Sequence, residues 1–178
     1  MSLITSIKQL IDSFENTRFS EQVNLIKKIN IPSSRFKRYA TWAEGGYTRN
    51  CIAREDDFEF ILLCWDSNSK TKIHDHAGQN CWIYQIQGDM RETRFKESDE
   101  GFEITHDTVL REGKVSYMHD RMGYHSLENI SGGRSMTLHI YASPIDQCQV
   151  YNEDTSSFEV VEMEYDTINT QILEKQEV

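Results

Sequence analysis

The sequence predicts a mainly β protein in which short N-terminal helices precede a barrel or sandwich of short strands. Short β-prone runs follow one another from about residue 44 onward, and turn signals such as Gly45-Gly46, Gly88-Asp89 and Gly113 separate them. Closely spaced strands without long helical patterns between them are typical of an all-β sandwich or barrel.

The N-terminal region, residues 1–43, has a helical pattern. Apolar residues recur at helical spacing over 3–14 and again over 23–29, and Pro32 ends the second stretch. A third short helix is expected over 35–42. We assign these helices a role in packing only.

The barrel is expected over about residues 44–166, followed by a polar C-terminal tail that frays. We find no internal repeat and no linker, so we predict one domain over residues 1–178. The predicted strands are 58–65, 81–87, 91–95, 102–110, 114–118, 126–130, 135–142, 148–151 and 158–165.

The composition narrows the classes of partner. The chain has 178 residues, which suits one compact domain, and a net charge of −10, which disfavours nucleic acid and anionic membranes. No apolar run approaches the length that spans a bilayer, and the first residues do not have the pattern of a secretion signal. We expect a monomeric protein with a small-molecule partner.

The four cysteines, Cys51, Cys64, Cys81 and Cys148, are irregularly spaced and form no CxxC pair. This argues against a zinc ribbon or a disulfide framework and favours the reducing cytoplasm. Most free cysteines are small buried apolar residues, and we treat Cys81 as the exception.

Three of the six histidines are predicted to bind a metal ion. Residues i and i+2 of a strand point to the same face, so His74 and His76 in His-Asp-His can bind one ion together. His125, from a distant strand, completes a three-histidine set that leaves positions open for substrate. His106 and His119 are interpreted as structural.

The residues around these histidines resemble the two-motif signature of the cupin barrel, which implies a jelly-roll-like fold. Cys81 and Gly88 follow His76, and Asn129 follows His125. Many metal cupins have a glutamate as fourth ligand, but no acidic residue lies between His76 and Gly88, and Cys81 takes that place. A three-histidine site suits an anionic chelating substrate together with O2.

Six motifs make the resemblance specific to the cysteine dioxygenase family, which converts cysteine to cysteine sulfinate: YTRN at 47–50, LCW at 63–65, IHDH at 73–76, the cysteine at 81, HSLEN at 125–129 and TLHIY at 137–141. The resemblance implies ferrous iron on the three histidines. It also implies that Arg49 binds the substrate carboxylate, with Tyr47 beside it and Trp65 near the site. A guanidinium fork matches a carboxylate bidentately.

The last motif implies a catalytic strand face. Thr137, His139 and Tyr141 alternate, so they point the same way, and in the family they form a hydrogen-bond chain in which the histidine holds the tyrosine phenol. Cys81 and Tyr141 match the residues that animal enzymes of the family join by a thioether bond. Cys148 matches a family cysteine near the pocket mouth and is not expected to be catalytic.

The sequence departs from the family after Tyr141, where Ser-Pro-Pro with a cis bond is common. This chain has Ala142-Ser143-Pro144, and a cis bond without proline costs about 2.5–4 kcal/mol. We therefore expect a trans bond here.

Other functions stay open. Related enzymes that oxidise 3-mercaptopropionate typically lack the arginine of YTRN and the cysteine of the first motif, so Arg49 and Cys81 favour cysteine over that thiol or cysteamine. A non-catalytic metal-binding cupin and a zinc-dependent cupin isomerase are further alternatives. Three histidines bind copper and zinc more tightly than ferrous iron, so the identity of the metal depends on the resemblance.

Overall fold

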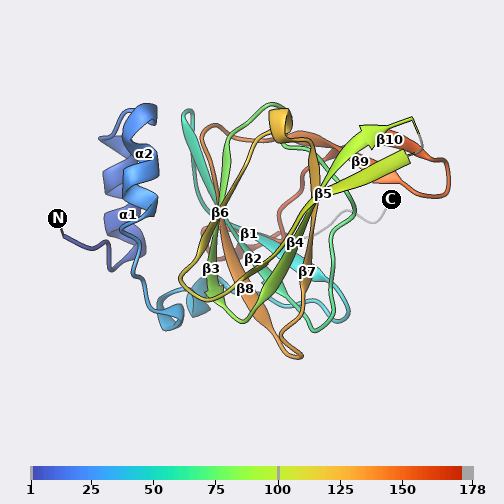
Figure 1. Ribbon diagram of the computed structural model, residues 1–178. Coiled ribbons are helices and arrows are strands. Elements are labelled where there is room, and N and C mark those ends of the chain that lie inside the picture. Colours follow the sequence, from blue (N-terminus) through green and yellow to red (C-terminus); the bar gives the residue numbers. More distant parts are fainter. Residues whose placement is uncertain (1, 100, 174–178) are drawn as a thin grey trace.

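Two facing β-sheets form a barrel in the computed structural model, which describes residues 2–99 and 101–173. Helices lie outside one sheet, and a separate hairpin lies at one end of the barrel (Figure 1). The mainly β fold predicted from the sequence is confirmed.

The larger sheet has seven strands in the order β12-β11-β1-β2-β8-β3-β6. The described pairings within it are antiparallel except for the parallel pair β1 and β11. Its strands are β1 (Tyr47–Glu55), β2 (Phe58–Trp65), β3 (Cys81–Gln87), β6 (Val115–Met118), β8 (Ser135–Tyr141), β11 (Thr167–Ile168) and β12 (Gln171–Ile172).

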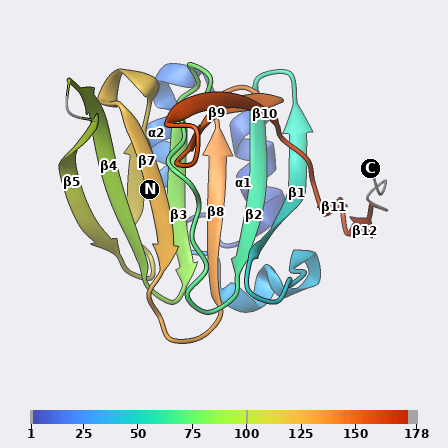
Figure 2. The ribbon, with the colours of Figure 1, turned by 90° about the vertical axis from the view of Figure 1, so that its right-hand side faces the viewer.

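The smaller sheet has three antiparallel strands in the order β5-β4-β7. They are β4 (Met90–Ser98), β5 (Gly101–Leu110) and β7 (Tyr124–Asn129), and the short 3-10 helix η3 (Asp120–Met122) precedes β7. The hairpin of β9 (Gln147–Asn152) and β10 (Ser157–Glu162) crosses the open end of the barrel (Figure 2).

The N-terminal helices α1 (Ile7–Glu15) and α2 (Phe19–Ile26) cover the outer face of the larger sheet (Figure 2). Ser6 caps α1 by accepting the backbone N–H of Gln9 at 3.2 Å. The third helix predicted over 35–42 is wrong, because two 3-10 turns, η1 (Ser33–Arg35) and η2 (Lys37–Tyr39), occupy this stretch.

Strand β2 separates two apolar cores, and all of its residues are buried. Phe58, Phe60 and Leu62 pack toward the helices, whereas Leu63 and Trp65 pack into the barrel interior. Successive residues of β2 therefore point to opposite faces of the sheet. One set packs against the helices, and the other lines the interior of the barrel.

Strand β1 is not among the strands predicted from the sequence, although the YTRN motif opens it. Its polar residues Thr48 and Asn50 are buried rather than exposed, and the Asn50 side-chain amide donates to the Leu62 carbonyl at 3.1 Å.

No cis peptide bond occurs in residues 2–99 and 101–173, so the bond from Ala142 to Ser143 is trans. No helix within this part of the chain is long and apolar enough to cross a membrane.

Candidate metal centre

His74 and His125 are brought together by their own backbones. The His74 N–H donates to the His125 carbonyl at 3.0 Å, and the His125 N–H donates back at 3.1 Å, in an isolated antiparallel bridge. Their Nε2 atoms lie 3.2 Å apart. Because β7 carries His125, one side of the centre is fixed to the smaller sheet.

His76 lies in the irregular connection between β2 and β3, so the expectation that His74 and His76 share a strand is wrong. The Asp120 carboxylate holds this connection by accepting the backbone N–H of His76 at 2.8 Å and that of Gly78. The connection still brings both imidazoles to one point. The nearest ligand atoms of His74, His76 and His125 all lie within 4.8 Å of one another.

The electrostatics of the histidines favour a bound cation. Burial and the neighbouring His125 lower the pKa of His74 to about 3 and that of His76 well below its usual value, so both rings are neutral at pH 7. Both His76 ring nitrogens are buried and have no hydrogen-bond partner among the described residues. Neutral imidazoles with free lone pairs are what a metal ion requires, so the site fits one.

Glu92 on β4 is a part of the centre that the sequence analysis missed. Its fully buried carboxylate lies 3.0 Å from His125 Nδ1 and also binds Ser116 and Arg94. Burial acts to raise the pKa of the Glu92 carboxyl. Its hydrogen-bond partners, among which His125 has the largest effect, lower that pKa to about 2. A carboxylate on Nδ1 leaves Nε2 of His125 as the ligand atom and raises its basicity. A lone glutamate in a strand gives no sequence signal for this contact.

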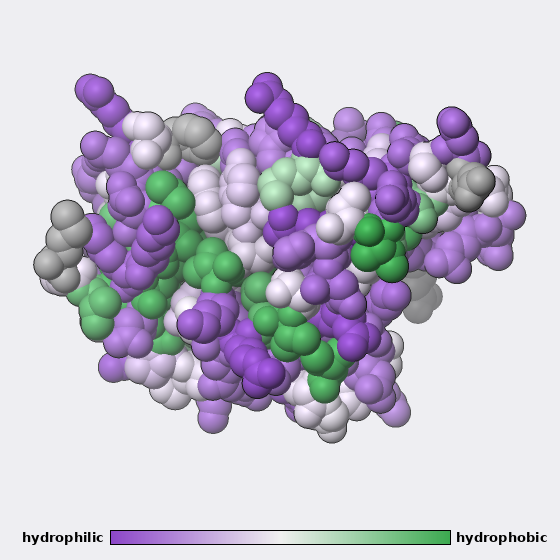
Figure 3. Space-filling model, viewed as in Figure 1, coloured by the Kyte–Doolittle hydropathy of each residue, from purple (hydrophilic) through white to green (hydrophobic). Residues whose placement is uncertain are grey.

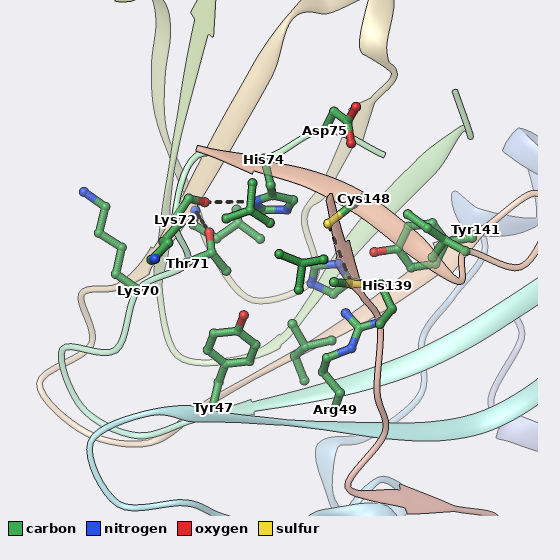
Figure 4. A pocket seen from close by; sticks show the side chains of 16 residues that line it. Tyr47, Arg49, Lys70, Thr71, Lys72, His74, Asp75, His139, Tyr141 and Cys148 are labelled. Atoms are coloured by element: carbon green, nitrogen blue, oxygen red, sulfur yellow. Dashed lines mark hydrogen bonds between the residues drawn. The ribbon is translucent and has the colours of Figure 1, made fainter. Parts of the chain in front are cut away.

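A cavity of about 430 Å³ opens beside the histidines. His74, His139, Tyr141, Tyr47 and Arg49 all line it, and His139 is drawn between His74 and Arg49 (Figure 4). The rest of the wall is largely apolar and includes Leu63, Leu127, Ile145, Val150, Val161 and Met163. On the face of the molecule seen in Figure 3, apolar residues form separate patches among polar ones.

Arg49 on β1 lines this cavity, and part of its guanidinium is not engaged by the described protein. Its Nε donates to the Glu164 carbonyl at 3.1 Å, whereas one terminal nitrogen is buried and has no partner among the described residues. Tyr47, two residues earlier on the same face, packs against Trp65 with ring centroids 4.7 Å apart. A buried guanidinium nitrogen without a partner is suited to an anionic ligand.

Thr137, His139 and Tyr141 lie on the interior face of β8, whereas Leu138 and Ile140 pack toward the helices. The His139 ring nitrogen Nε2 lies 3.1 Å from the Thr137 hydroxyl, which also accepts from Trp65 Nε1 at 2.9 Å. The described hydrogen bond of His139 therefore runs to Thr137. The rings of His139 and Tyr141 stack at 6.4 Å.

Cys81 and Tyr141 stand directly opposite each other in the pairing of β3 with β8. Burial raises the pKa of the Cys81 thiol, and a hydrogen bond with Tyr141 partly opposes this. Tyr141 also lies close to the metal-binding cluster, with its ring centroid 6.1 Å from that of His76. Cys148 lines the cavity, whereas His106 is exposed on β5 and outside the cluster.

Comparisons with known proteins identify the family of this chain. The family model for cysteine dioxygenase type I matches residues 1–154. Cysteine dioxygenase type 1 of Danio rerio is 27% identical over 169 residues, covering 92% of this chain and 84% of the relative. The Homo sapiens enzyme of the same name is 33% identical over 133 residues, covering 71% of this chain and 66% of the relative.

A solved structure from Klebsiella pneumoniae with a double-stranded β-helix domain superposes with a TM-score of 0.51, at 13% identity over 71% of this chain and 94% of the other. At this identity the match shows the fold alone. The barrel and its cluster of three histidines, which could hold a metal ion, define the cupin class. Within that class, the chain belongs to the cysteine dioxygenase type I family.

Proposed function

We propose that this protein is a non-haem iron dioxygenase that oxidises L-cysteine to cysteine sulfinate. In this reaction a thiolate and O2 give a sulfinate, so both oxygen atoms join the sulfur and no other oxidant is needed. The observation that carries the proposal is one cavity with two unlike ends. His74, one of three clustered histidines, lines one end, and at the other lies the Arg49 guanidinium, one nitrogen of which is buried without a partner among the described residues.

Ferrous iron is the metal we propose for His74, His76 and His125. When bound there, iron would supply the redox chemistry that joins O2 to sulfur. The protein would supply three imidazole ligands and no carboxylate ligand, because the Glu92 carboxylate is engaged by His125, Arg94 and Ser116. A dication held by these histidines would favour the thiolate form of a bound thiol.

Arg49 would bind the carboxylate of cysteine, and Tyr47 would border it. The guanidinium offers parallel donors in a fixed plane, which matches a carboxylate in a partly dry pocket. The apolar wall that includes Leu63 and Leu127 limits water around the sulfur.

Tyr141 would act as a hydrogen-bond donor beside the reacting sulfur, and His139 would assist it from the same strand face. Burial and the adjacent Cys81 raise the pKa of Tyr141 well above its usual value, so the phenol keeps its proton at pH 7. Thr137 and Trp65 hold His139 in place through the shared hydroxyl.

We further propose a thioether bond between Cys81 and Tyr141. Their direct opposition in the strand pairing supports it. Forming this bond removes two hydrogen atoms, with O2 as the oxidant, so peptide mass analysis of oxygen-exposed active protein should find a peptide pair lighter by two hydrogens. Only unlinked Cys81 in such protein would contradict the bond.

The test of the activity is oxygen uptake by anaerobically iron-loaded protein, with the sulfinate product measured. We expect L-cysteine to be oxidised faster than 3-mercaptopropionate or cysteamine at equal concentration, and metal-free protein to be inactive. A clear preference for 3-mercaptopropionate would support a related thiol dioxygenase instead. No oxygen uptake with any of the three thiols would support a non-catalytic metal-binding cupin.

A further inference from the structure

Residues 164–169 run beside β1, and two of them, Thr167 and Ile168, form the strand β11. The Asp166 N–H donates to the Arg49 carbonyl at 2.8 Å, and the Asn169 N–H donates to the Cys51 carbonyl at 3.0 Å. Thr167 in β11 pairs with Asn50 in β1. Figure 2 shows β11 alongside the end of β1. The chain therefore returns, more than a hundred residues later, to the strand that carries Arg49.

Two further hydrogen bonds from this segment fix Arg49 itself. The Asp166 carboxylate accepts the backbone N–H of Arg49 at 2.8 Å, so the two residues bind each other in both directions. The Glu164 carbonyl accepts from Arg49 Nε at 3.1 Å. Because a guanidinium is planar, a bond at Nε sets the direction of its terminal nitrogens, one of which is buried without a described partner.

On its other side, the segment is anchored by polar residues around the buried Glu59. The Tyr165 hydroxyl binds the carboxylate of Glu59, which is fully buried, and Arg54 binds both of them. The Met163 N–H donates to the Asp146 carbonyl at 2.7 Å. Glu164 and Asp166 thus lie between a fixed cluster and a fixed strand, which allows them to act as a rigid support.

We propose that Asp166 is a positioning residue for Arg49 and that it helps to select short thiols with a carboxylate near the sulfur. By holding the backbone of Arg49 and the Glu164 carbonyl in register, Asp166 sets the separation between the guanidinium and the histidines. This inference rests on the proposed function. Asp166 acts through Arg49 and does not touch the substrate.

The test compares Asp166→Ala, Asp166→Asn and the matched control Asp146→Ala. Asp146 lies near the same segment, but its carboxylate pairs with Arg54 at 2.5 Å and its side chain is 80% exposed. The readouts are the Kd for L-cysteine from anaerobic calorimetry on iron-loaded protein, the KM and kcat for oxygen uptake, the iron content and the melting temperature.

We expect Asp166→Ala to raise the Kd and KM for cysteine about tenfold, with kcat changed less than about twofold and iron content unchanged. Asp166→Asn should recover most of the binding, because its amide oxygen still accepts the Arg49 N–H. Asp146→Ala should bind cysteine like the wild type.

Wild-type cysteine binding in Asp166→Ala would overturn the inference. So would an equal loss in Asp146→Ala, or a loss in Asp166→Asn as large as that in Asp166→Ala. If the wild type forms no sulfinate while calorimetry shows the expected pattern of cysteine binding, the proposed function fails and the positioning role of Asp166 stands.

Discussion

The histidine end and the arginine end of the cavity are built in different ways. His125 lies on a regular strand, its backbone pairs with His74, and its ring contacts the fully buried Glu92. Arg49 is only partly buried, and residues from the last part of the described chain, Glu164 and Asp166, fix its position. Residues close to the barrel core thus determine one end, and a peripheral segment determines the other.

Because the two ends are held by different residues, metal binding and substrate binding should be separable. Changes at the histidine end should lower metal affinity, whereas changes at the arginine end should weaken cysteine binding and leave the metal in place. The variants below test whether metal binding and substrate binding are separable.

The largest effect is expected for His76→Ala. Its ring nitrogens have no described partner, so the variant removes a metal ligand without breaking a hydrogen bond to the described protein. We expect iron binding to be lost and sulfinate formation to fall by about a thousandfold or more. Metal analysis after gel filtration measures the first. His106→Ala, on the exposed part of β5, is the control and should retain full iron content.

Arg49→Ala tests the other end. We expect the KM for cysteine to rise about a hundredfold, because a charged bidentate contact is lost, with iron content equal to that of the wild type. Steady-state oxygen uptake and metal analysis on the same samples measure both quantities. Arg91→Ala is the control, since its ion-pair distances are 3.6 and 3.7 Å and its side chain is 46% exposed. Loss of iron in Arg49→Ala would contradict the separation.

Glu92→Gln should weaken metal binding about 10- to 100-fold, because the amide keeps the shape of the carboxylate but not its charge next to His125. A competitive titration with a metal-binding dye measures the affinity without any turnover. Glu128→Gln, on β7 but partly exposed, is the matched control. An unchanged affinity in Glu92→Gln would remove Glu92 from the metal centre.

A smaller effect, about threefold on kcat, is expected for Cys81→Ser. Without the thioether bond, Tyr141 keeps its place in β8 and its protonated phenol but is less rigidly held. Cys51→Ser, a buried cysteine outside the cavity lining, serves as the control. An equal loss of kcat in both variants would point to packing rather than to a role of Cys81 beside Tyr141.

The smallest effect concerns Cys148 in the cavity wall. Burial raises the pKa of its thiol to about 11, so at pH 7 it is almost entirely protonated and reacts slowly with iodoacetamide. Because the thiolate fraction grows as the pH approaches the pKa, the alkylation rate should rise about tenfold per pH unit from 7 to 10. Peptide mass analysis over time measures it. A rate independent of pH would show that the thiol is not held in its neutral form.

Much of this architecture could be predicted from local sequence signals. The strand 81–87 is correct to the residue, because β-prone residues end there at Gly88-Asp89. The convergence of His74, His76 and His125 follows from the motif spacing, although His76 lies on a connection rather than on a strand.

The parts that could not be predicted depend on contacts between distant segments. Glu92 meets His125 only because β4 pairs with β7, and Asp166 meets Arg49 only because β11 pairs with β1. Strand β1 was missed because a buried Asn50 breaks the expected alternation of apolar and polar residues.

The single domain, the monomeric state and the cytoplasmic location stay predictions.

The most direct test of the account measures oxygen consumed and sulfinate formed by wild type and Arg49→Ala with equal iron content. The account predicts that the wild type forms one sulfinate per O2 from L-cysteine. Arg49→Ala should be slow at low cysteine concentration and approach the wild-type rate when cysteine is raised. Oxygen uptake without sulfinate, or wild-type rates for Arg49→Ala at low cysteine concentration, would contradict it.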